Sequence, residues 1–456
     1  MKFKTVNPST GEVLKEYTSM SKEEVLRIAE KCNTAQKTWK TKPLKERAAL
    51  LVKLAAVLRK NKEKYAAIMT EEMGKPINDS TAEIEKCAWT AEVYAQNAER
   101  WLKEEIVEAD GVKHRVVFQP LGVILAVMPW NFPFWQALRF GMPALLSGNT
   151  GMLKHASATT GAALAVESAF KEAGFPEHVF RTIIADHETV AELLAHPIIK
   201  GVSLTGSTPA GKKIAAIAGQ HLKKVVLELG GSDPFIVRED ADVELTAQNA
   251  LKGRFQNCGQ SCIAAKRFIV HEKIADAFTK RLAELAGKLV VGNPKKMNTT
   301  MGPLVNENAA KDIDAQVKRA VAEGARILTG GKRMSGAFYS PTILTNITKE
   351  MKVAQEEVFG PVASIIVVHN DDEAIEIANN TPFGLGGSVW TKDLERGEHI
   401  ARQIEAGSVF VNSIVKSDPR MPFGGIKESG LGRELSHWAL REFVNIKGLS
   451  VYEHKK

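Results

Sequence analysis

Cysteine is scarce in this 456-residue chain, and no apolar run is long enough to span a bilayer. The four cysteines, Cys32, Cys87, Cys258 and Cys262, do not form a disulfide framework and fit a reducing compartment. None stands with histidines at the spacing of a zinc site, so we expect no metal. Residues 1–8 lack the apolar segment of a secretory signal. These absences predict a cytoplasmic protein without membrane contact.

A segment dominated by one sign of charge is also missing. The net charge is +8, but basic residues alternate with acidic ones, as in Lys45-Glu46-Arg47. This pattern predicts a solvated surface rather than a nucleic-acid interface, although a basic average favours an anionic cofactor or substrate. The length suits two or three domains that share an interface.

Helical patterns occupy the first hundred residues. Ser21 and Glu24 form a capping box, which predicts a helix from 22 to about 39. Apolar residues recur at helical spacing over 45–73, and 79–101 is predicted as a third helix. We expect these helices to be scaffold.

A β-hairpin is predicted next, at Asp110-Gly111 between the β-rich segments 106–109 and 112–118. Segment 443–452 near the C-terminus is also strand-like. A hairpin that follows three helices has an exposed edge unless something pairs with it. We therefore hypothesise a sheet shared between subunits.

From Gly122 onward, strand and helix patterns alternate. Five strands are predicted before the Gly230-Gly231 pair, at 123–128, 152–154, 182–185, 201–204 and 224–229. The alternation predicts an α/β fold with a parallel, doubly wound sheet that binds ligands at the carboxyl ends of its strands. After Cys262 the alternation resumes, which indicates a second α/β domain.

Three stretches contain candidate catalytic groups. Cys262 ends a Gly-Gln-Ser-Cys turn, where a thiol can act as a nucleophile or be a small buried residue. Asn131 is framed by Pro129 and Pro133, so its amide is either an aimed oxyanion donor or a turn residue. Glu228 ends an apolar strand, which raises a carboxyl pKa and suits a general base, or else it is a paired structural glutamate.

Two further stretches are weaker signals alone. Thr205-Gly206-Ser207, with Gly211 opening a helix, can present N–H groups to a phosphate but lacks the full dinucleotide fingerprint. Glu357 and Phe359 lie in Glu-Val-Phe-Gly-Pro, which elsewhere is an ordinary loop.

Together, and in this order, the proline-framed Asn, Glu-Leu-Gly-Gly, Gly-Gln-Ser-Cys and Glu-Val-Phe-Gly-Pro resemble the NAD(P)-dependent aldehyde dehydrogenase superfamily. The resemblance runs from Asn7-Pro8 to the final strand, and Met421 to Lys427 is similar to that family's late motif. It implies a Rossmann-like cofactor domain (1–101 and 122–229), a catalytic domain (230–437) and a β-hairpin oligomerisation element (102–121 and 438–456). It also implies a homodimer or homotetramer.

The resemblance implies a role for each matching residue. Cys262 would attack the aldehyde carbon, Asn131 and the Cys262 N–H would hold the oxyanion, and Glu228 would activate water to hydrolyse the thioester. The implied cofactor-binding residues are Trp130, Lys154, Ser157, Gly206, Ser207, Gly211, Glu357 and Phe359. Among these, Lys154 and Glu357 would bind the two riboses.

Ser157 bears on cofactor choice. The family often has a carboxylate at this position, which repels a 2′-phosphate, whereas a serine hydroxyl can donate a hydrogen bond. We therefore expect NADP to be preferred and NAD to be usable. The alternative is that Ser157 merely caps a helix.

Arg139 bears on the substrate. It lies eight residues after Asn131, near one helix face, and can clamp a distal carboxylate or be solvated. The clamp and Ser417 resemble the succinate-semialdehyde branch of the family. Some members of the family carry a second arginine about six residues before the nucleophile. Here that position has no arginine, and Arg254 is the nearest candidate. A single clamp implies weaker discrimination among short acidic aldehydes.

Cys258 lies four residues before Cys262. Either the two form a reversible disulfide, or Cys258 packs under the loop.

These expectations predict an enzyme that oxidises an aldehyde to its acid, with succinate semialdehyde as the first candidate substrate. Glutarate semialdehyde, lactaldehyde and a non-catalytic binding relative are the alternatives. A coenzyme A-dependent acylating enzyme is disfavoured, because Glu228 would hydrolyse its thioester.

Overall fold

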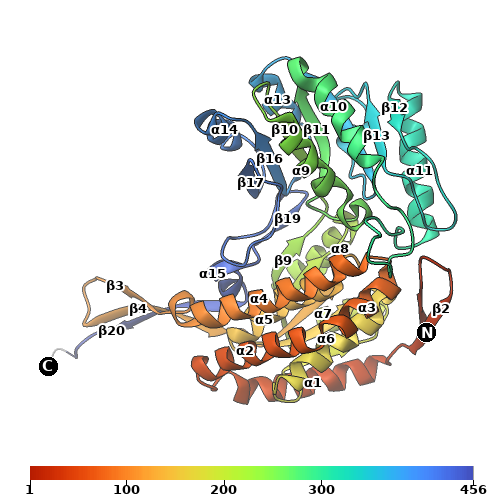
Figure 1. The fold of residues 1–456 in the computed structure, drawn as a ribbon. Coiled ribbons are helices and arrows are strands. Elements are labelled where there is room, and N and C mark those ends of the chain that lie inside the picture. The colour runs from red at the N-terminus through yellow and green to blue at the C-terminus, as the bar shows by residue number, and fades with distance from the viewer. Residues whose placement is uncertain (455–456) are drawn as a thin grey trace.

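The computed structural model describes residues 1–454 and contains two α/β domains and a projecting sheet (Figure 1). The first domain is built on a six-stranded sheet of order β19-β9-β8-β5-β6-β7, in which all strands but β19 run parallel. This confirms the predicted doubly wound arrangement. The strands are β5 (Val123–Met128), β6 (Thr150–His155), β7 (Phe180–Ile183), β8 (Ile199–Thr205), β9 (Lys224–Glu228) and β19 (Gly430–Leu431).

Helices cover both faces of this sheet, and each face has its own apolar core. One face packs against α1 (Lys22–Trp39), α7 (His187–Ala195) and α8 (Thr208–Gln220). The other packs against α5 (Pro133–Leu146) and α6 (Thr160–Glu172), outside which lie α2 (Leu44–Lys60), α3 (Lys62–Met73) and α4 (Ile77–Trp101). The predicted capping box at Ser21 is present.

The helix predicted over 45–73 is wrong in one respect, because it is two helices. The break falls at Asn61, whose φ of −102° and ψ of 16° are not helical. The Asn61 side-chain amide donates to the Val57 carbonyl at 3.1 Å, and such local bonds compete with the helical ladder. The apolar pattern continues across the break, so periodicity alone does not reveal it.

The second domain has a seven-stranded sheet of order β12-β13-β14-β11-β10-β16-β17. Its strands are β10 (Asp233–Val237), β11 (Ala265–His271), β12 (Arg326–Thr329), β13 (Thr342–Thr345), β14 (Val362–Val368), β16 (Gly386–Trp390) and β17 (Ser408–Val411). Its helices are α9 (Val243–Phe255), α10 (Glu272–Ala286), α11 (Glu307–Ala322), α12 (Lys352–Gln355), α13 (Asp371–Asn379) and α14 (Leu394–Ala401). The predicted second α/β domain is therefore present.

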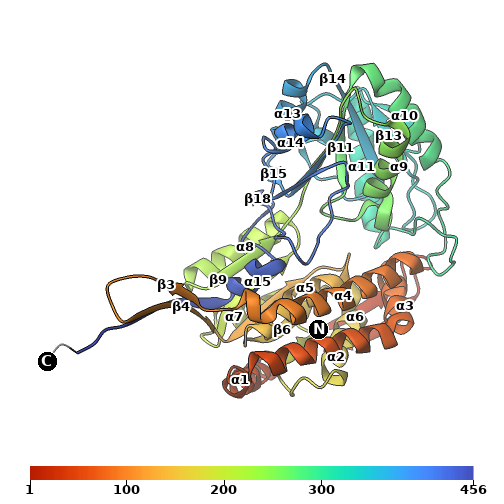
Figure 2. The same cartoon turned by 60° about the vertical axis from the view of Figure 1, so that its left-hand side comes forward.

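The predicted hairpin forms the third part. β3 (Glu105–Val107) and β4 (Lys113–Pro120) pair antiparallel, and β20 (Val444–Val451) pairs with the other edge of β4. Figures 1 and 2 show this sheet projecting from the molecule and carrying the C-terminal end. A further hairpin, which we did not predict, is formed by β1 (Lys2–Val6) and β2 (Val13–Thr18).

The chain between the second domain and β20 departs from the predicted boundaries. Gly430 in β19 pairs with Glu228 in β9, so this segment joins the first sheet. Helix α15 (Ser436–Glu442) then packs against α5, where the Ser147 hydroxyl donates to the Leu440 carbonyl at 2.8 Å. Residues 430–442 thus cover the first domain, instead of belonging to the second domain or to the projecting sheet.

Candidate active site

Four neighbouring parallel strands end at one edge of the first sheet. β9, β8, β5 and β6 lie side by side, so their carboxyl ends bring together four loops that are distant in the sequence. Glu228 ends β9, Thr205 ends β8, and Asn131 follows β5 by three residues. The second domain supplies Cys262 to the same place from the loop before β11.

The loop that carries Cys262 is turned sharply by three consecutive residues with positive φ. These are Asn257 at 52°, Cys258 at 56° and Gly259 at 71°. A side chain on Gly259 would come within 2.4 Å of the Gly360 carbonyl oxygen, so glycine is needed there. The turn presents Cys262, which is half-buried, to the first domain.

A buried lysine fixes the same loop. The Lys266 ammonium donates to the carbonyls of Ser261 at 2.9 Å and Cys262 at 2.8 Å, and lies 3.6 Å from the Glu357 carboxylate. Burial raises the pKa of the Cys262 thiol to about 12, although Arg139 and Lys266 oppose the shift. The thiol is therefore protonated at neutral pH in this state.

Asn131 is oriented by the two polar atoms of its own amide. Its Oδ1 accepts from Gln136 Nε2 at 3.0 Å, which identifies the other atom as the nitrogen. That nitrogen donates to the Gln260 carbonyl at 3.1 Å, in the loop that carries Cys262. An amide nitrogen has two hydrogens, so one remains to stabilise negative charge beside Cys262.

Glu228 is buried and faces a second carboxyl. Burial raises the pKa of Glu228 well above its ordinary value, and the Glu434 carboxyl raises it further. Glu434, whose pKa is also raised by burial, forms a buried ion pair with Arg139. A side chain at Gly424, where φ is +154°, would lie 2.7 Å from Glu228 Oε1. The Glu228 carboxyl is thus held close enough to Cys262 to raise the pKa of its thiol.

Two cavities meet at Cys262. One, of about 270 Å³, is lined by Arg139, Ser417 and other residues of α4, α5 and the loop after β17. The other, of about 290 Å³, is lined by Asn131 and by five predicted cofactor-binding residues, Trp130 and four more. Those four are Gly206, Ser207, Glu357 and Phe359. A thiol between two cavities can react with one ligand from each.

The predicted substrate residues lie in different surroundings. Ser417 is buried and lines the first cavity. Arg139 also lines it, but its guanidinium already pairs with Glu434 and donates to the Thr205 hydroxyl at 3.3 Å. Arg254 does not reach the cavity: it is buried and donates to backbone carbonyls, including those of Ala265 at 3.2 Å and Val358 at 3.0 Å. We therefore assign Arg254 to holding the loop together.

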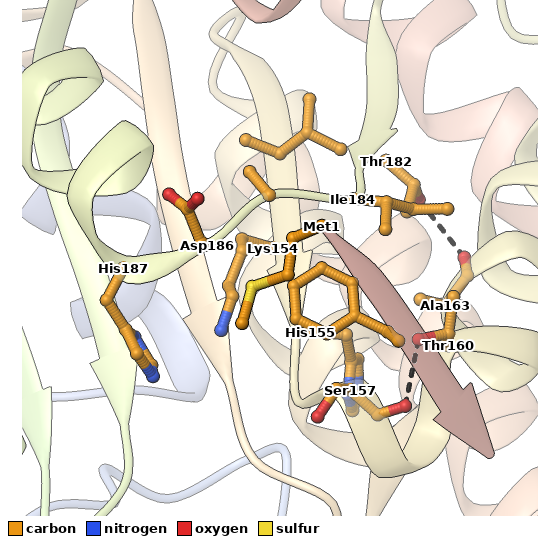
Figure 3. Close-up of a pocket in the computed structure, with 13 residues that line it drawn as sticks. Met1, Lys154, His155, Ser157, Thr160, Ala163, Thr182, Ile184, Asp186 and His187 are labelled. Carbon is orange, nitrogen blue, oxygen red and sulfur yellow. Dashed lines mark hydrogen bonds between the residues drawn. The ribbon is translucent and has the colours of Figure 1, made fainter. Parts of the chain in front are cut away.

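A third cavity, shown in Figure 3, holds the remaining cofactor candidates. Lys154 and Ser157 line it from the end of β6 and the turn after it, opposite Asp186 and His187. Burial lowers the pKa of Lys154. The Asp186 carboxylate is engaged at 2.8 Å with the Thr189 N–H as the N-cap of α7. The Lys154 ammonium and the exposed Ser157 hydroxyl thus face this cavity, and position 157 carries no carboxylate.

Gly211 is the cofactor candidate that lines none of these cavities. It is buried in α8, and a side chain there would approach Leu229 to 2.5 Å. Its role is close packing of α8 against the end of β9.

Several residues of the site had no recognisable signal in the sequence. Glu434 and Gln260 contact residues far away in the chain, Arg139 and Val305, whereas Gln136 and Lys266 each hold a residue five positions away. Cys258 is buried in the core of the second domain, as the packing alternative requires, and all four cysteines are free.

Known proteins are similar to this chain over nearly its whole length. The aldehyde dehydrogenase family matches residues 1–449. A probable succinate-semialdehyde dehydrogenase (NADP+) of Synechocystis is 46% identical over 98% of this chain and 99% of its own length. Succinate-semialdehyde dehydrogenase (NADP+) 1 of Mycobacterium tuberculosis is 45% identical, with the same coverage.

Solved structures are also similar to this chain over nearly its whole length. Succinic semialdehyde dehydrogenase from Streptococcus pyogenes, determined in complex with NADP+, superposes with a TM-score of 0.97 at 37% identity, covering 99% of this chain and 100% of that one. The motifs, the fold and the arrangement around Cys262 lead to one conclusion: the chain belongs to the aldehyde dehydrogenase family.

Proposed function

We propose that this protein oxidises succinate semialdehyde to succinate with NADP as the preferred acceptor. The observation that carries the proposal is the position of Cys262 between two cavities, one beside Asn131 and the other beside Arg139 and Ser417. The first suits the reacting end of a cofactor, and the second suits a short substrate with a polar far end.

The residues account for each step of the chemistry. The Cys262 sulfur, once deprotonated, bonds to the aldehyde carbon, and the new oxyanion is held by Asn131 Nδ2 and the Cys262 N–H. Lys154, Ser157, Glu357 and Phe359 would hold NADP, which would supply the hydride acceptor for this carbon. The thioester that remains is attacked by water, whose proton goes to Glu228, and the acid and free thiol are released.

The cofactor cavity supports NADP. Lys154 and Ser157 offer a positive charge and a hydroxyl, and Asp186 is engaged by its helix. A 2′-phosphate therefore meets donors at position 157 instead of a like charge. The relatives named above carry NADP(+) in their names, which supports the same choice, and NAD remains usable.

An acidic substrate is supported by the charges in the first cavity. Arg139 and Ser417 are the groups that the sequence suggested for a distal carboxylate, and the same relatives are named for succinate semialdehyde. We also propose a homodimer or homotetramer that works in the cytoplasm, since β20 and β3 expose apolar side chains and the four cysteines are free.

An aldehyde panel tests the function. NADP reduction is measured with succinate semialdehyde, glutarate semialdehyde, lactaldehyde and butanal, with and without coenzyme A. We expect the highest kcat/KM for succinate semialdehyde and no effect of coenzyme A. A requirement for coenzyme A would indicate an acylating enzyme, and no turnover of any aldehyde would indicate a non-catalytic relative.

A further inference from the structure

Lys86 is a third polar group in the substrate-side cavity, and the sequence did not single it out. It lies on α4, and its ammonium is 2.5 Å from the Ser417 hydroxyl oxygen. The same ammonium lies 4.1 Å from the centre of the Trp135 ring. The stem is half-buried, and the head points into the cavity that contains Cys262.

The charge on Lys86 lacks a counterion, unlike its buried neighbours. Lys75, just before α4, pairs with Glu83, and Arg139 pairs with Glu434. Within residues 1–454, no carboxylate lies at ion-pair distance from the Lys86 ammonium. A desolvated cation without an anion is costly, and a second cation, Arg139, lies across the same cavity. The cavity is therefore built to receive a negative charge.

We propose that Lys86, together with the Ser417 hydroxyl, is the principal binding group for the distal carboxylate of the substrate. This inference rests on the proposed function and changes which residue sets its specificity. Arg139 is satisfied by Glu434 without a ligand, whereas Lys86 is satisfied only when an anion enters. An ammonium has three donors, so it can keep Ser417 and bind a carboxylate oxygen at once.

The proposal predicts a pH dependence. Burial and the positive charge of Arg139 on α5 together lower the pKa of Lys86 to about 8. The other charged or titratable groups that face Lys86 or line its cavity are Glu83 and Cys87 on α4, Asp418 after β17, Asp79, Lys252, Lys416 and Cys262. Above about pH 8 the amine becomes neutral, so recognition of an acidic aldehyde should weaken.

The test uses two aldehydes of equal length, succinate semialdehyde and butanal. The ratio of their kcat/KM values cancels ionisations common to both, including that of Cys262. We expect Lys86→Met to lower this ratio by about 30-fold or more, as for a buried charge pair that loses one partner. Lys252→Met, which removes an exposed lysine at the same cavity, is the matched control and should change the ratio by less than about threefold.

Lys86→Arg and pH make the result decisive. Lys86→Arg should keep most of the ratio and should remove its decline above pH 8, because arginine stays charged. A wild-type enzyme that turns over both aldehydes equally would refute the proposed substrate. A wild type that prefers the acid, with the preference intact in Lys86→Met and lost only in Arg139→Met, would overturn the role of Lys86 alone.

Discussion

At the scale of single residues, the Cys262 thiol is held in its protonated form. The cavity walls remove water from Cys262, and burial raises the pKa of its thiol to about 12 despite the nearby Arg139 and Lys266. The reactive species is the thiolate, whose fraction falls about tenfold for each pH unit below that value. The raised pKa therefore protects the thiol from reaction before ligands bind.

Alkylation by iodoacetamide measures this state. Without cofactor, the rate at Cys262 should rise about tenfold per unit between pH 7 and 10 without a plateau, because the thiol pKa lies above this range. Peptide mass spectrometry identifies the modified residue, and Cys262→Ala is the control. A plateau near pH 8 would contradict the account.

At the same scale, we propose that position 157 determines the choice of cofactor. Ser157→Glu places a carboxylate in the cavity of Lys154, where it repels a 2′-phosphate. We expect the kcat/KM with NADP to fall by about tenfold or more and that with NAD to change much less. Ser157→Gln, which adds bulk without charge, is the control. Equal use of NAD and NADP by the wild type, or full NADP use by Ser157→Glu, would refute the preference.

At the scale of elements, α4 organises the start of α5. No side chain within α5 caps its first turn; instead, Glu83 of α4 accepts from the N–H groups of Phe134 at 3.0 Å and Trp135 at 2.9 Å. The carboxylate also favours the positive end of the α5 dipole and pairs with the fully buried Lys75. This arrangement fixes the loop that bears Asn131.

Removing Lys75 should therefore destabilise the protein. Lys75→Met leaves the Glu83 charge buried and unpaired, at a cost of about 3–5 kcal/mol. Lys75→Met with Glu83→Gln should recover most of the lost Tm, since the amide still accepts from α5 without a charge. Thermal unfolding checks both variants. An unchanged Tm in the single variant, or additive losses in the double one, would argue against the buried pair.

The sequence predicted elements better than the contacts between them. The strand over 123–128 and the capping box at Ser21 were found because their signals are local. The break at Asn61 was missed because the apolar pattern continues across it, and the hairpin β1–β2 was missed although Asn7, Pro8 and Gly11 are turn residues between two strands. The cap from Glu83 was invisible because donor and acceptor are 51 residues apart.

The same distinction holds for the site. Cys262, Asn131 and Glu228 were predicted from motifs that recur across a family. Lys86 and Glu434 lie in helical or loop sequence without a motif, and their importance comes from what they face. Arg254 was misplaced because a position in sequence does not tell which side of a loop a side chain enters.

At the scale of the whole molecule, the projecting sheet is too apolar to be left in water. Ile106, Ile446 and Leu449 are 77%, 57% and 46% exposed, on a three-stranded sheet that packs little against the rest of the chain. Exposed apolar strands with free edges invite pairing with another subunit. This sheet is the surface through which we expect copies of the chain to associate.

Light scattering at micromolar concentration tests the association. The wild type should be a dimer or tetramer, and Ile106→Lys with Ile446→Lys should shift it toward monomer, because two buried charges would lack partners. Leu394→Lys is the matched control, since Leu394 is 64% exposed and lies in α14 of the second domain. A monomeric wild type, or an unchanged mass in the double variant, would contradict the expectation.

Two domains converge on the sulfur of Cys262. The most direct measurement is peptide mass spectrometry of Glu228→Gln after mixing with NADP and succinate semialdehyde. We expect one acyl group per chain, bound to Cys262, because the thioester forms but water is no longer activated. An acyl group on another residue, or unimpaired turnover without any adduct, would contradict the account.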